Sequence, residues 1–213
     1  MLDSKSFIVF DLDGTLVDSF TDVCFAMNEA LKKINCNPLP DDIIQALIGP
    51  DLAAAITKVV PEPHFTFAEF IDHYVAIYNQ CSTQHTRLFN GVATVLEQLQ
   101  QQGKTCAVLT NKPEDQAITI LKALGVFDYF VAVVGPDTYD SPKPNPKGLL
   151  TLCERFNKTV AETVLVGDTE TDLMTASNAN VTGIAVTHGY RTEAELLTYQ
   201  PAGVIQSLTD LIG

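Results

Sequence analysis

The sequence contains few basic residues. Its 13 lysines and arginines stand against 26 aspartates and glutamates, which gives a formal net charge of -13 at pH 7. Nucleic acids and anionic membranes are bound through clustered Lys and Arg, so we expect neither as a partner. A small anionic ligand is still compatible with this charge, because a local group of cations, amides and metal can oppose it within a Debye length of about 8 Å.

Long apolar runs and paired cysteines are also missing. No run approaches the roughly 20 apolar residues of a transmembrane helix, and residues 1–5 lack the basic region of a signal peptide. The five cysteines are scattered without a Cys-x-x-Cys pair, which favours reduced thiols over disulfides or a zinc site. We therefore expect a cytoplasmic protein, and 213 residues suffice for one domain or a domain with an insertion.

Strands and helices alternate in the second half of the sequence. A buried strand is expected at residues 7–10, and further strands at residues 105–109, 129–134, 163–166 and 183–186, with helices between them. This alternation predicts an α/β fold, a Rossmann-like three-layer α/β/α sandwich with a mainly parallel five-stranded sheet. Short helices are expected near residues 193–199 and 205–211.

Only helical patterns occur between the first two strands. Helices are expected near residues 20–34, 41–47, 51–59 and 67–79, separated by prolines and glycine. We predict an inserted all-α domain at residues 17–87 and a core domain formed by residues 1–16 and 88–213. Short hinge strands are expected at residues 16–19 and 87–91, where the chain enters and leaves the insertion.

The first strand ends in two carboxylates and a glycine, Asp11-Leu12-Asp13-Gly14. Open α/β sheets bind ligands at the carboxyl ends of their parallel strands, so this position suits a reaction centre. Asp and Gly are also the commonest turn formers, and the stretch alone fits an ordinary strand-to-turn junction equally well.

Two further polar stretches follow expected strands. Thr110, Asn111 and Lys112 precede a helix, where a hydroxyl beside the helix N-terminus can form an anion site, although a lone Thr there is more often an N-cap. Lys143 lies in a loop with three prolines at residues 142–146, which fix φ and restrict where the lysine can be. That pattern also fits a surface lysine in a proline-rich turn.

Asp168 and Asp172 follow the strand expected at residues 163–166, and four carboxylates can therefore converge with Asp11 and Asp13. Two unit charges about 4 Å apart repel by about 4 kcal/mol at an effective dielectric of 20. A divalent cation that prefers oxygen ligands resolves this repulsion, and Mg²⁺ fits best because it binds a few carboxylates together with water and phosphate oxygens.

These four stretches resemble, in order, the four motifs of the haloacid dehalogenase superfamily, and the insertion is similar to its helical cap. The most similar subgroup is the phosphoglycolate phosphatase-like one. The resemblance implies a Mg²⁺-dependent phosphatase that hydrolyses a small phosphate monoester through an aspartyl-phosphate. The resemblance implies three catalytic residues: Asp11 as nucleophile, Asp13 as general acid and base, and Lys143. It implies that the phosphate is bound by Gly14, Thr110, Asn111 and Lys143. The implied metal ligands are Asp11, Asp13, Asp168 and Asp172.

The substrate is less clearly indicated. Gly49 and Pro50 are similar to the subgroup's specificity loop, but they also fit a plain helix break. Residues 18–86 contain three lysines, no arginine and nine acids, few cations for the carboxylate of phosphoglycolate. We expect a small phosphorylated metabolite and a monomer or homodimer. A pyrophosphatase, a 5′-nucleotidase, a phosphohexose mutase and a non-catalytic binding module are the alternatives.

Overall fold

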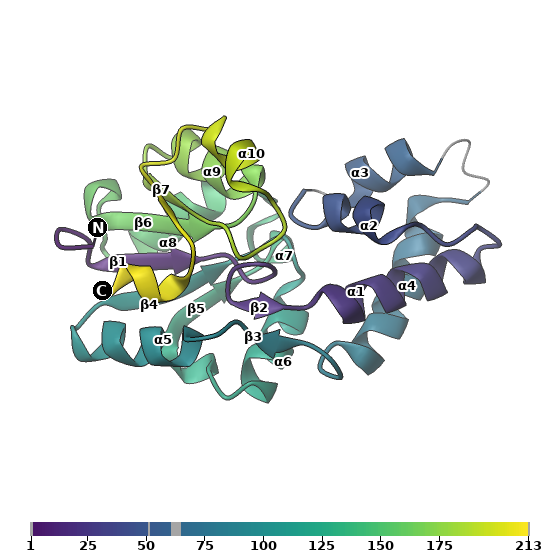
Figure 1. Ribbon diagram of the computed structural model, residues 1–213, viewed down its shortest axis with the longest axis horizontal. Coiled ribbons are helices and arrows are strands. Elements are labelled where there is room, and N and C mark those ends of the chain that lie inside the picture. The colour runs from purple at the N-terminus through teal and green to yellow at the C-terminus, as the bar shows by residue number, and fades with distance from the viewer. Residues whose placement is uncertain (1, 51, 61–64, 213) are drawn as a thin grey trace.

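The computed structural model describes residues 2–50, 52–60 and 65–212. Its centre is a parallel sheet of six strands in the order β5-β4-β1-β6-β7-β8 (Figure 1). The strands are β1 (Phe7–Phe10), β4 (Thr105–Leu109), β5 (Phe130–Val134), β6 (Thr163–Gly167), β7 (Thr182–Val186) and β8 (Gly203–Ile205). The α/β class, the parallel sheet and the first five strands were predicted correctly.

The prediction of five strands was wrong by one, because β8 was not predicted and its last residue, Ile205, was placed at the start of a helix. The three residues of β8 pair in parallel with β7, with Ile184 beside Gly203. A strand this short carries little periodic signal, and its pairing with β7 creates it. The helical part that follows is only the 3-10 helix η3 (Leu208–Leu211).

Helices cover both faces of the sheet. Ile8, Phe10 and neighbouring side chains pack against α5 (Val92–Gln101), α6 (Glu114–Ala123) and η3. Phe7 and Val9 point the other way, toward α8 (Lys147–Arg155) and α9 (Glu170–Asn178). This alternation is the period of two expected of a strand buried on both faces. The remaining short helices of this part are η1 (Phe127–Tyr129), α7 (Pro136–Tyr139), η2 (Val160–Glu162) and α10 (Glu193–Leu197).

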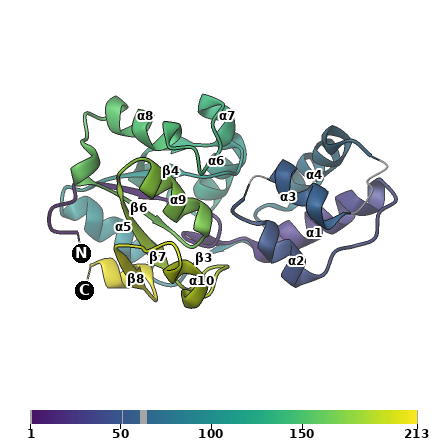
Figure 2. The same cartoon turned by 90° about the horizontal axis from the view of Figure 1, so that it is seen from above.

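The register places the ends of three strands side by side. Phe10 of β1 pairs with Val108 of β4 and with Val166 of β6. The residues that follow these strands therefore meet at one edge of the sheet, next to the helical insertion (Figures 1 and 2).

The insertion consists of four helices: α1 (Phe20–Lys33), α2 (Asp41–Leu47), α3 (Leu52–Val59) and α4 (Phe67–Cys81). Helices α1 and α4 run side by side, and Figure 2 shows the group as a lobe beside the sheet. Two short strands connect it to the sheet, β2 (Val17–Asp18) and β3 (Arg87–Leu88), which lie where the hinge strands were predicted and pair antiparallel. No helix among residues 2–50, 52–60 and 65–212 is long and apolar enough to cross a membrane.

Asp22 fixes the start of α1 to the chain that leaves the insertion. Its buried carboxylate accepts hydrogen bonds from the backbone N–H groups of His85 and Thr86 and from the Thr86 hydroxyl, at 2.8 to 3.1 Å. Burial raises the pKa of Asp22, but the bonds from His85 and Thr86 outweigh it, and its pKa is lowered overall.

Candidate active site

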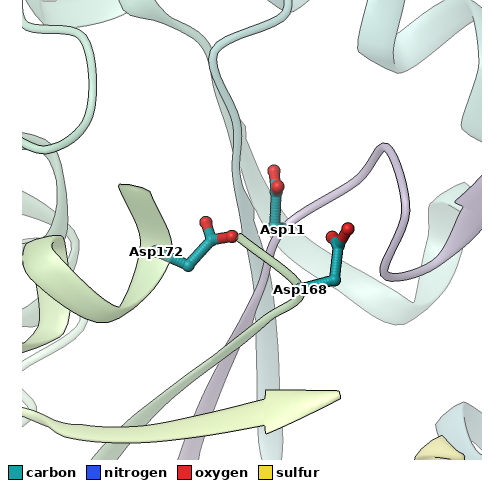
Figure 3. A group of neighbouring side chains, drawn as sticks. All are labelled: Asp11, Asp168 and Asp172. Atoms are coloured by element: carbon teal, nitrogen blue, oxygen red, sulfur yellow. The ribbon is translucent and has the colours of Figure 1, made fainter. Parts of the chain in front are cut away.

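Three aspartates converge at the edge of the sheet. Asp11 follows β1, Asp168 follows β6, and Asp172 lies in the first turn of α9. All three are buried, and one carboxylate oxygen of each lies within 4.8 Å of the others. Figure 3 shows the side chains extending from these segments toward the same region. The expected convergence of the acids is therefore present for three of the four.

Short hydrogen bonds hold two of these carboxylates. Asp168 accepts the Thr15 hydroxyl at 2.8 Å and the Tyr190 backbone N–H at 2.8 Å. Asp172 accepts hydrogen bonds from the Thr169 hydroxyl at 2.7 Å and from the Thr169 backbone N–H at 3.1 Å. Thr15 and Tyr190 lie on separate loops, so the tertiary structure fixes Asp168 in place, whereas Thr169 is the N-cap residue of α9 and holds Asp172 through a local capping box.

Lys143 reaches the same cluster. Its ammonium nitrogen lies 2.8 Å from Asp11 Oδ1 and 2.6 Å from Asp172 Oδ1, and the side chain is buried. Burial alone lowers the pKa of Lys143, but Asp11 and Asp172 outweigh it and raise the pKa above its usual value. The lysine between the prolines is thus a buried ion-pair partner and not a surface residue.

Asn111 organises two loops around Lys143. Its side-chain oxygen accepts the Lys143 backbone N–H at 2.7 Å, and its side-chain nitrogen donates to the Lys143 carbonyl at 3.0 Å. The same nitrogen donates to the Gly49 carbonyl at 2.9 Å. The Asn111 side chain therefore joins the loop that carries Lys143 to the loop of Gly49 and Pro50. Asp51, which follows Pro50, lies outside the described residues.

Thr110 is buried at the end of β4, and its hydroxyl oxygen accepts the Lys112 backbone N–H at 3.1 Å. It does not cap the following helix, because the N-cap residue of α6 is Pro113. This removes the N-cap interpretation of Thr110.

The site carries more negative than positive charge. When fully ionised, Asp11, Asp13, Asp168 and Asp172 carry four negative charges, and the two lysines within salt-bridge distance of them supply two positive charges. Burial, and then the charge of Asp172, raises the pKa of Asp11 to about 7 and holds the pKa of Asp168 well above its usual value.

This acidic site fits a divalent cation. Asp11 Oδ1 is buried and has no hydrogen-bond partner, although the Lys143 ammonium lies 2.8 Å away. Three converging carboxylates are oxygen ligands of the kind that hard cations select, and a charge of two would balance the site. The donor set and the charge together indicate a metal site formed by Asp11, Asp168 and Asp172.

Asp13 lies beside this group and has partners of its own. One of its oxygens accepts the Ser19 hydroxyl, and the other lies 3.1 Å from the Lys112 ammonium. Lys112 also donates to the Tyr78 hydroxyl of α4 at 2.9 Å. Lys112 was given no role from the sequence, and its contact with Tyr78 was not predicted.

Two glycines make room for Asp168. Gly14 has φ +84, and a Cβ atom there would lie 2.2 Å from Asp168 Oδ2. A Cβ atom at Gly189 would lie 2.3 Å from the same oxygen. Gly14 was expected to help bind a phosphate, and the structure adds its close approach to Asp168. Gly189 was missed, because a lone glycine in a loop gives no local sign of what it faces.

Arg191 connects the insertion to the sheet domain. Its guanidinium binds Glu170 at 2.8 Å and donates to the carbonyls of Ala46 and Ile48 at 3.3 and 3.2 Å, at the C-terminus of α2. A positive charge at a helix C-terminus is favourable. His188 stacks on Phe89 with ring centroids 4.1 Å apart.

A cavity of about 320 Å³ lies between the sheet edge and the insertion. Asp11, Asp13 and Thr110 line it from the sheet side, and Gly49 and Pro50 line it from the insertion. The first two aspartates are thus accessible to a small ligand, and the loop predicted to determine specificity borders the same space.

A parallel α/β sheet with acids at its carboxyl edge and helices inserted after the first strand defines a class of hydrolases. The chain belongs to this class: residues 8–186 match the family of haloacid dehalogenase-like hydrolases. This confirms the family that the four motifs predicted.

Known proteins are similar over nearly the whole chain. A phosphoglycolate phosphatase of Vibrio parahaemolyticus is 30% identical, over 96% of this chain and 93% of the relative. A probable phosphatase, IndB, of Dickeya dadantii is 34% identical, over 98% and 93%. The crystal structure of a predicted phosphoglycolate phosphatase from Haemophilus somnus superposes with a TM-score of 0.91 at 28% identity, over 100% of this chain and 98% of that one.

Proposed function

We propose that this protein is a Mg²⁺-dependent phosphatase that hydrolyses a small-molecule phosphate monoester. The observation that carries the proposal is the buried group of Asp11, Asp168, Asp172 and Lys143 beside a ligand-sized cavity. The acids provide a nucleophile and ligands for a cation, and the lysine provides a positive charge for an anionic substrate.

Asp11 is the proposed nucleophile. Its carboxylate would attack phosphorus in line with the leaving oxygen, giving an aspartyl-phosphate and a free alcohol. Asp13 would protonate that oxygen and then remove a proton from the water that hydrolyses the intermediate. Ser19 and Lys112 contact its two oxygens and orient it for both proton transfers.

Charge on the phosphoryl group would be stabilised by Lys143, Thr110 and the amide of Asn111. Lys143 already lies 2.8 Å from the proposed nucleophile. Gly14 would allow the backbone to approach the phosphate.

Asp11, Asp168, Asp172 and the backbone carbonyl of Asp13 would hold the Mg²⁺, and the bound ion would neutralise charge that develops on the phosphoryl oxygens. Residues 17–87 would form a cap domain over the catalytic core of residues 1–16 and 88–213. The cap would close the cavity and select the substrate, with Gly49 and Pro50 in its specificity loop.

Phosphate release with Mg²⁺ from small phosphate esters, including phosphoglycolate, nucleoside monophosphates and pyrophosphate, tests the proposal. Asp11→Asn should lower turnover by more than about 10³-fold, because the amide is a poor nucleophile. Asp128→Asn, at an exposed aspartate, is the matched control and should retain full turnover. Chelation of divalent ions should abolish release, and Mg²⁺ should restore it.

Two results would contradict the proposal. Substantial turnover by the Asp11→Asn variant would indicate direct attack by water. Conversion of one sugar phosphate into its isomer without net phosphate release would indicate a mutase.

A further inference from the structure

The cavity beside Asp11 has an apolar wall. Helix α4 contributes Phe67, Ile71 and Val75, which are half-buried and lie four residues apart on one face of the helix. The end of α2 adds Leu47, and Ile48 follows it. Apolar side chains that remain partly accessible inside a cavity gain contacts and lose exposed area when an apolar group enters.

Positive charge is scarce in the same space. Of the described residues that line the cavity, Lys112 alone carries a positive charge. Its ammonium is already shared between Asp13 at 3.1 Å and the Tyr78 hydroxyl at 2.9 Å. The insertion's lysines, Lys32, Lys33 and Lys58, are exposed on the protein surface and are not among the residues that line the cavity.

A second anion on the substrate would therefore be poorly accommodated. A carboxylate among Phe67, Ile71 and Val75 would lose its hydration without gaining a cation. Recruiting Lys112 would take that lysine from Asp13 and leave the buried Asp13 carboxylate without its cationic partner. An uncharged hydrocarbon group would lose no such hydration and would not remove Lys112 from Asp13.

We propose that the preferred substrate is a phosphate monoester whose alcohol part is uncharged and apolar, an alkyl or aromatic group, and not an ester that carries a carboxylate. This inference rests on the proposed phosphatase function and specifies the substrate class of the same site. The phosphate would lie at Asp11 and Thr110, and the alcohol part against α4 and the end of α2.

Three esters test the preference: phosphoglycolate, ethyl phosphate and benzyl phosphate. The first two share the CH₂ group that carries the phosphate and differ in a carboxylate against a methyl group. We expect kcat/KM to rise from phosphoglycolate to ethyl phosphate to benzyl phosphate. Each buried methylene is worth about fourfold, so benzyl phosphate should exceed ethyl phosphate by more than about tenfold.

Two variants test the location of the alcohol part. Phe67→Ala and Ile71→Ala should each lower kcat/KM for benzyl phosphate by about fivefold to twentyfold. Neither variant should change kcat/KM for ethyl phosphate by more than about twofold from the wild-type value. Phe25→Ala is the control, because Phe25 lies on α1 with 55% of its surface exposed and does not line the cavity. Circular dichroism identifies any variant that does not fold, and the other variant then carries the test.

The outcomes separate this inference from the function on which it rests. A kcat/KM for phosphoglycolate equal to or above that for benzyl phosphate overturns the inference and leaves the phosphatase function intact. Equal losses on ethyl and benzyl phosphate in both wall variants also overturn it. No phosphate release from any ester, or release that Asp11→Asn does not remove, overturns both proposals.

Discussion

Replacing Gly14 by alanine should destabilise the protein through its contact with Asp168. The new Cβ atom would lie 2.2 Å from Asp168 Oδ2 and 2.6 Å from its Cγ, closer than van der Waals contact allows. Asp168 has little freedom to move away, because Thr15 and Tyr190 each bind one of its oxygens at 2.8 Å.

The expected loss has two parts. Alanine in the left-handed region, at φ +84, costs about 1–2 kcal/mol. Forcing the new methyl group against the buried carboxylate adds about 1–3 kcal/mol, the usual cost of overpacking. We therefore expect Gly14→Ala to lower the free energy of unfolding by about 2–5 kcal/mol.

Gly125→Ala separates the two parts. Gly125 has φ +72 at the end of α6, but a Cβ atom there would meet no atom within 4 Å. This variant should lose only the backbone part, about 1–2 kcal/mol. The difference between the two variants then measures the contact with Asp168.

Urea denaturation without added Mg²⁺ gives the free energies of unfolding, because a bound ion would add its own stabilisation. In an Asp168→Ala background, Gly14→Ala should cost no more than Gly125→Ala does in the wild type. Equal losses for Gly14→Ala and Gly125→Ala, or a cost of Gly14→Ala unchanged by the loss of Asp168, would refute the reasoning.

Three further predictions concern the metal, the pH and the insertion. Mg²⁺ at 100 times its dissociation constant should raise the free energy of unfolding by about 2.7 kcal/mol, which titration in urea measures; no shift would contradict the metal site. Asp22→Asn should lower the free energy of unfolding by about 1–3 kcal/mol at pH 7. Because the folded-state pKa of Asp22 is lowered, this contribution is present above the unfolded pKa of about 3.9 and lost as pH falls through the folded pKa. A difference from wild type that does not shrink as pH falls below about 3.9 would contradict it. Arg191→Met should speed amide exchange in α2, whereas Lys32→Met, at an exposed ion pair, should leave it unchanged.

The side chains that line the cavity are the feature that the structure shows and the sequence reveals least. Phe67, Phe70 and Tyr74 recur at helical spacing in α4, and Phe70 and Tyr74 are buried. The sequence could not show that Phe67 and Ile71 line a cavity beside Asp11. That depends on how the insertion lies against the sheet edge, which Arg191 and Asn111 help to fix through carbonyls more than 60 residues away in the sequence.

By itself, the sequence determined the strand that precedes Asp11, the helical insertion and the order of the four motifs. These are local signals, since a buried strand is a continuous apolar run and a helix repeats every 3.6 residues. Only the tertiary structure decided that β8 adds a sixth strand, that Lys112 pairs with Asp13, and that Gly14 and Gly189 both face Asp168. Each of these depends on contacts between segments far apart in the chain, and such contacts leave no periodic pattern in the sequence.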